Sequence, residues 1–227
     1  MSGALVFLLL PLATLGVLLA PLGVTAVAAQ QPVAGRLTGR VNATVIAAVS
    51  ALADSAAARG LPVDPLVEKA IEGGAKAAPS ERIAAAVQAV FARLGRAQQA
   101  LQAATQTATP DAIAAGAFAL SAGLQDSDVR NVARACGAHC SPAAALRVAG
   151  TLAALGVPSA ETVELVRETL RAGGRDRDVV ALPVRVEAQV ARGATPAQAA
   201  SGLARAAAAG APGHPKSPDQ GPTPIKP

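Results

Sequence analysis

The chain has 227 residues, of which 52% are apolar, and its 20 basic and 15 acidic side chains give a formal net charge of +5. Alanine is the most frequent residue, Trp and Tyr are absent and only three Phe occur, which favours helices and argues against a strand-rich fold. The basic charge comes without the clustered patch or the aromatic stacking platforms of nucleic-acid-binding proteins, so we expect no nucleic-acid partner.

The first 29 residues form an apolar segment without a charged side chain. Small residues follow its apolar run at Ala26, Ala28 and Ala29, which is the pattern that signal peptidase reads. We therefore expect a signal peptide over residues 1–29 and a mature protein in the periplasm or outside the cell. The usual positively charged start is missing and the apolar run is long enough to span a bilayer, so an uncleaved N-terminal membrane anchor is the alternative.

Residues 36–209 are predicted to form an α-helical domain of about eight or nine helices, because Gly, Pro and capping residues recur between apolar segments. Asp64 and Ser159 are expected to act as N-caps, and Pro183 is expected to kink or delay its helix. The expected helices run over 40–59, 65–78, 81–106 and 110–121, from 126 or 127 through Ala133, from 142 to Leu155, and over 160–172, 179–190 and 196–209.

Four of the breaks between helices look alike in sequence. They read GLPVDP (60–65), GLQDSD (123–128), GVPSAE (156–161) and GATPAQ (193–198). The last three begin 33 and 37 residues apart, which is the length of one helical hairpin. The sequence therefore predicts stacked antiparallel helical hairpins, as a short solenoid or an irregular helical bundle.

The last 18 residues, 210–227, are rich in Pro, Gly and polar residues. Such a segment cannot bury enough apolar surface to fold alone. We expect a disordered Pro-rich tail.

The one constellation of reactive side chains is Cys136-Gly137-Ala138-His139-Cys140. Two cysteines in an exported protein favour a disulfide between Cys136 and Cys140. Free thiols, redox chemistry, and a metal site formed by Cys136, His139 and Cys140 are the alternatives, although a structural zinc site takes four ligands and the C-x-x-x-C spacing is not that of thioredoxin-like proteins.

The sequence holds no G-x-S-x-G, H-E-x-x-H, P-loop or dinucleotide-binding signature, so we expect no cofactor and no enzyme activity. Two groups of carboxylates lie at helical spacing among basic residues, a pattern that is typical of a solvated helix face. These groups are Asp64, Glu68 and Glu72, with Lys69 among them, and Glu161, Glu164 and Glu168, with Arg167 and Arg171.

The segments GLPVDPLVEKAIEGGAKAAPSERIAAAV (60–87), GVPSAETVELVRETLRAGG and ARGATPAQAA resemble uncharacterised exported, Ala-rich α-helical proteins of GC-rich bacteria. The resemblance covers most of residues 60–200 and implies no activity. From the residues themselves we expect a non-enzymatic binding or scaffold module of the cell envelope, with a protein or an envelope polymer as its partner and with membrane contact only if the N-terminal segment is uncleaved. The alternative is a thiol, disulfide or metal-binding protein that uses the loop of Cys136, His139 and Cys140.

Overall fold

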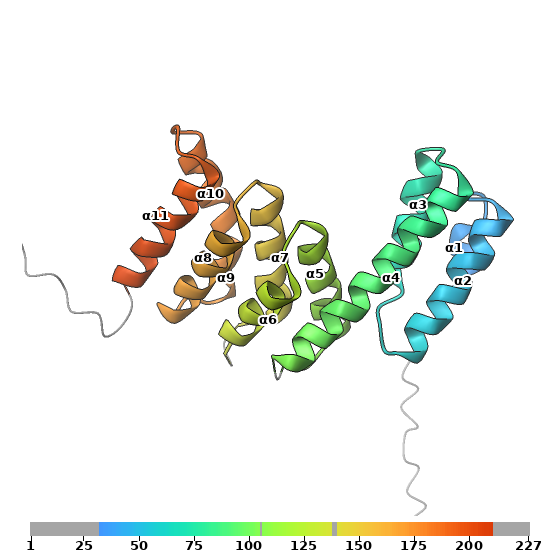
Figure 1. Cartoon of the computed structure of the whole chain (residues 1–227), viewed down its shortest axis with the longest axis horizontal. Coiled ribbons are helices and arrows are strands. Elements are labelled where there is room, and N and C mark those ends of the chain that lie inside the picture. The colour runs from blue at the N-terminus through green and yellow to red at the C-terminus, as the bar shows by residue number, and fades with distance from the viewer. Residues whose placement is uncertain (1–31, 105, 138–139, 211–227) are drawn as a thin grey trace, which may run out of the picture. The chain divides into compact units, whose positions relative to one another are not determined.

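The computed structural model describes residues 32–104, 106–137 and 140–210, and within these ranges all regular structure is helical. The signal peptide expected over 1–29, His139, and the expected tail beyond residue 210 lie outside the described residues. Figure 1 shows the helices in chain order. They are α1 Val33–Leu37, α2 Ala43–Ala58, α3 Asp64–Ala75, α4 Ser80–Ala103, α5 Pro110–Ser121, α6 Asp126–Ala135, α7 Pro142–Ala154, α8 Ser159–Arg171, α9 Asp176–Val180, α10 Leu182–Val190 and α11 Pro196–Ala209.

The helices of residues 32–210 stack in two layers. One layer consists of α2, α4, α6, α8 and α11, each of which packs on the next. In the other layer α5 packs on α7, and α7 packs on both α9 and α10. Near the start of the stack, α1 packs on α2 and α3, and α3 packs on α4. The prediction of an all-α fold built from stacked antiparallel hairpins is confirmed for this part of the chain (Figure 1).

The four similar breaks form the same kind of turn. Each places its glycine at a positive φ between 68° and 109°, a left-handed conformation that glycine adopts without steric cost. After α2 the amide of Leu61 donates to the carbonyl of Ala56 over 2.9 Å, and the other three turns repeat this bond. The apolar residue after the glycine is buried at Leu61, Leu124 and Val157. The glycine therefore ends the helix, and the next residue anchors the turn in the core.

The N-caps predicted at Asp64 and Ser159 are wrong. The N-cap of α3 is Val63 and that of α8 is Pro158, so Asp64 and Ser159 are the first residues of their helices. Pro158 accommodates the extended cap conformation because its ring fixes φ near −65°. Asp64 instead forms an ion pair with Arg36 over 2.5 Å. Its carboxylate lies in the first turn of α3, where a negative charge also interacts favourably with the helix dipole.

The sequence did not indicate α1, which begins at Val33, before the boundary expected at residue 36. This single short helix buries Leu37 completely. At the other end of the domain, the predicted effect of Pro183 is confirmed, because the helix breaks at Ala181 and resumes with Pro183 in the first turn of α10.

The core of residues 32–210 consists of Leu, Val, Ile and many Ala side chains, and the small residues let helices approach closely. At Gly116 of α5, an added Cβ would lie 3.0 Å from the Cβ of Ala97 on α4. Of the helices in the described ranges, none combines the length and the apolar character needed to cross a bilayer.

Candidate functional site

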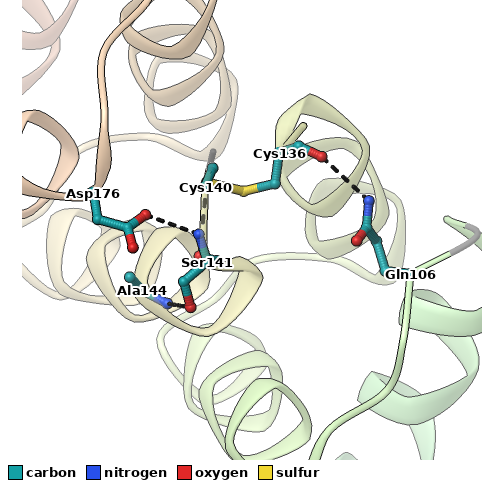
Figure 2. Close-up of a disulfide and its surroundings, with 6 residues drawn as sticks. All are labelled: Gln106, Cys136, Cys140, Ser141, Ala144 and Asp176. Atoms are coloured by element: carbon teal, nitrogen blue, oxygen red, sulfur yellow. Dashed lines mark hydrogen bonds between the residues drawn. A yellow bond between two sulfur atoms is a disulfide. The ribbon is translucent and has the colours of Figure 1, made fainter. Parts of the chain in front are cut away.

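The turn between α6 and α7 carries the two cysteines. The structure joins Cys136, which follows the last residue of α6, to Cys140 by a disulfide (Figure 2). Their Cα atoms lie 5.0 Å apart. Cys136 is buried in the core and Cys140 is half-buried, so the link lies at the edge of the packed interior.

Hydrogen bonds fasten this turn on two sides, as Figure 2 shows. The side-chain amide of Gln106, which follows α4, donates to the carbonyl of Cys136 over 3.2 Å. On the other side, the backbone amide of Ser141 donates to Asp176, the first residue of α9, over 2.8 Å. These bonds tie the connection after α4, the turn after α6 and the start of α9 to one another. These contacts fit a structural role for the turn.

The weaker alternative, a metal site at this turn, stays a prediction. The structure brings Cys136 and Cys140 together, whereas His139 lies outside the described residues. Across the described ranges, no group of three or more His, Cys, Asp or Glu is placed to hold a metal ion. Thiol titration and intact mass of the exported protein separate a stable disulfide from free or metal-bound thiols.

A groove of about 660 Å³ lies between α3 on one side and α5 and α7 on the other, and we call it the α3–α5 groove. Helix α4 packs against both α3 and α5 and contributes the side chains between them. The volume falls in the range of ligand-binding clefts. The groove is lined by Pro65, Glu68, Lys69 and Glu72 of α3, Val90 and Arg93 of α4, Ala114, Ala115, Ala117, Phe118 and Ser121 of α5, and Arg147 and Thr151 of α7.

Among the described residues that line this groove, Phe118 is the only aromatic one, and 42% of its surface is exposed. The ring lies against α7 where Gly150 has no side chain, since a Cβ at that position would come within 2.6 Å of two ring carbons. The bare backbone of Gly150 thus lets the ring lie across the α5–α7 contact without entering the core. An exposed ring on a concave surface provides a large, rigid apolar contact for a partner.

Charged side chains of both signs line the same groove. Glu72 accepts hydrogen bonds from Lys69 over 2.8 Å and from Lys76 over 2.5 Å. The hydrogen bond from Lys69 is the largest cause that lowers the pKa of Glu72 to about 2, followed by the hydrogen bond from Lys76 and the charges of the two lysines. Arg93 is half-buried and Arg147 is exposed, and within the described ranges neither forms a salt bridge or a side-chain hydrogen bond. The groove therefore offers two guanidinium groups that are not already neutralised.

The two predicted carboxylate groups have different surroundings. On α3, Glu68 and Glu72 line the groove, while Asp64 pairs with Arg36. On α8, Glu161, Glu164 and Glu168 line a smaller hollow of about 390 Å³ against α11. The prediction of a solvated face is wrong for Glu168, whose side chain is only 12% exposed. Helix α11 packs beside α8, and the carboxylate of Glu168 forms ion pairs with Arg167 and Arg171.

Sequence reasoning did not identify Phe118, Arg93 and Arg147 as residues that line one groove. The residues of α5 are buried on nearly every side, so no periodic pattern marks Phe118 as exposed. The two arginines belong to helices that are separated in the chain by all of α5 and α6. Their shared groove depends on how the helices pack, which the sequence pattern does not encode.

No protein-family model, curated protein or solved structure matches this chain. The proposal for its function therefore starts from the groove and the disulfide turn.

Proposed function

We propose that this chain is an exported, non-enzymatic binding module of the cell envelope and that the α3–α5 groove holds its partner. Two observations support export. The first 29 residues are apolar and uncharged and end in small residues, as in a signal peptide. The Cys136–Cys140 disulfide is typical of proteins outside the reducing cytoplasm.

The observation that carries the binding proposal is the half-exposed ring of Phe118 in a groove lined by four helices. Aromatic and arginine side chains dominate the binding energy of many protein interfaces. Stacked helical hairpins commonly bind partners along the extended surface that their neighbouring units form together. Phe118 is thus the expected anchor of the interface.

Site-specific photocrosslinking tests this proposal. The photoreactive residue is introduced at Ser121, which is exposed and lines the groove, and, as the matched control, at Ser127, which is exposed on α6 outside it. The full chain is expressed with its N-terminal segment, and the cells are irradiated and fractionated. We expect a discrete adduct in the envelope fraction from position 121 and none from 127. Equal labelling at both positions, no adduct at 121, or unprocessed chain confined to the cytosol contradicts the proposal.

A further inference from the structure

We propose that the partner in the α3–α5 groove is a polypeptide segment that carries a carboxylate next to an apolar side chain. This inference rests on the proposed binding function of the groove and adds the chemistry of the partner. The groove provides an apolar part and a charged part, and each part constrains the ligand separately.

The apolar part centres on Phe118. Val90, Ala114 and Ala117 line the same groove and add apolar side chains to its wall. Covering a ring that is 42% exposed removes apolar surface from water, which is the main favourable term in most protein association. An aliphatic or aromatic side chain of the partner is the group that can use this contact.

The charged part favours an anion. The side chains that line the groove include three cations and two anions, and one of the anions, Glu72, is already bonded to two lysines. Arg93 and Arg147 form no ion pair within the described ranges, so a carboxylate can bind them without displacing another acid. A guanidinium group can bind a carboxylate through two parallel hydrogen bonds, which fixes the orientation of the ligand.

The mixed signs favour a polypeptide over a uniformly anionic polymer. Glu68 lies on the α3 side of the groove and forms no ion pair with a described residue. A polyanion placed along the groove would bring its charges close to Glu68 and Glu72, and like charges at short range are repulsive. A peptide can place one carboxylate near the arginines and an uncharged or basic group near α3.

Fluorescence anisotropy with two labelled nine-residue peptides tests the inference. Both carry a central Leu-Phe pair, flanked by aspartates in one peptide and by lysines in the other. We expect the processed protein to bind the aspartate peptide at least tenfold more tightly than the lysine peptide, with an affinity that falls as salt is added. Arg147→Glu should abolish this preference, and Phe118→Ser should weaken binding of the aspartate peptide about tenfold.

Matched controls are Arg192→Glu and Val184→Ser, which alter an exposed arginine and an exposed apolar residue of the same domain outside the groove. They should leave both affinities unchanged. Phe118→Leu and Arg93→Gln repeat the test with smaller changes if circular dichroism shows that either groove variant is unfolded.

The outcomes separate this inference from the binding function on which it rests. Preference for the lysine peptide overturns the carboxylate inference, and so does an aspartate preference that survives both Arg147→Glu and Arg93→Gln. In either case, weaker peptide binding by Phe118→Ser still supports binding in the groove. If dextran sulfate at a comparable concentration of charge displaces the peptide and binds more tightly than the peptide does, the inference of a polypeptide partner is overturned in favour of a polyanion. Binding of neither peptide, together with no adduct at position 121, overturns both proposals.

Discussion

Ala77 adopts a backbone conformation that the chain elsewhere in the described ranges gives only to glycine. Its φ is +49°, and it follows α3 as Gly173 follows α8. The amides of Ala77 and Ala78 donate to the carbonyls of Gly74 and Gly73, the same bonds that close the turn after α8. A side chain in this left-handed region costs about 1–2 kcal/mol. The turn therefore forms despite its residue, because hydrogen bonds and packing fix it.

We expect Ala77→Gly to raise the free energy of unfolding by about 0.5–1 kcal/mol, because relief of the steric cost exceeds the added entropy of the unfolded chain. Urea denaturation measures the change. Gly173→Ala, the reverse exchange at the equivalent position after α8, is the control and should lower the free energy of unfolding by about 1 kcal/mol. A destabilised Ala77→Gly variant would show that the side chain of Ala77 makes a favourable contact that outweighs the strain.

Glu72 is the residue for which a pH dependence is expected. Hydrogen bonds and charges of Lys69 and Lys76 lower its pKa from 4.5 to about 2. A lowered pKa in the folded state stabilises the fold above pH 4.5, and the contribution is lost as the pH falls from 4.5 towards 2. The unfolding midpoint should therefore exceed that of Glu72→Gln at pH 7, and the difference should narrow steadily as the pH falls from 4.5 towards 2.

Thermal unfolding of both proteins between pH 2.5 and 7 measures this convergence. Because the side chains are exposed, the difference should be small and should shrink in 1 M salt. Glu187→Gln, which changes an exposed carboxylate of α10, is the control and should show no comparable pH dependence. A difference between Glu72→Gln and the parent that is as large at pH 2.5 as at pH 7 contradicts the role of the charge.

At the scale of the helices, the contact between α5 and α7 depends on the missing side chain of Gly150. A Cβ there would lie 2.6 Å from the ring of Phe118 and 3.1 Å from the Cα of Ala119, so both a ring and a backbone would have to move. We expect Gly150→Ala to lower the free energy of unfolding by about 1–3 kcal/mol, since overpacking outweighs the better helix propensity of alanine.

Gly202 of α11 provides a matched control, because an added Cβ would meet nothing within 4 Å. Gly202→Ala should therefore stabilise the protein by about 0.5–1 kcal/mol through helix propensity alone. Chemical denaturation of the two variants gives the comparison. Stabilisation of the protein by both substitutions would contradict the close approach of α5 to α7 at Gly150.

The helices themselves could largely be predicted from the sequence because the signals that start and end them are local. The expected helix over 110–121 coincides with α5, and Gly60 and Gly156 end helices as expected. The cap of α3 could not be predicted, since the role of Asp64 depends on Arg36, which lies 28 residues earlier in the chain. The α3–α5 groove could not be predicted either, because its lining side chains come from four helices that only the packing of the domain brings together.

At the scale of the described domain, each helix packs mainly on its neighbours in the stack, so stability is expected to be local rather than uniform. The pairing of α8 with α11 is among the most extensive contacts and buries Ala199, Ala200 and Ala204. No helix of the described ranges packs on the far side of α11. The C-terminal end of the stack therefore depends on the alanine-rich contacts of α11 with α8 and α10.

We expect a chain that stops after Gly193, and so lacks α11, to lose protection from amide hydrogen exchange in α8 and α10. Helices α2 to α5 should exchange as before, because none of them packs on α11. Hydrogen–deuterium exchange with mass spectrometry measures both regions in one experiment. A chain that stops after Gly210 keeps α11 and serves as the control, with unchanged exchange throughout residues 32–209. Faster exchange spread evenly over all helices of the shorter chain would mean that the stack unfolds as one cooperative unit, contrary to this view of neighbour-by-neighbour stability.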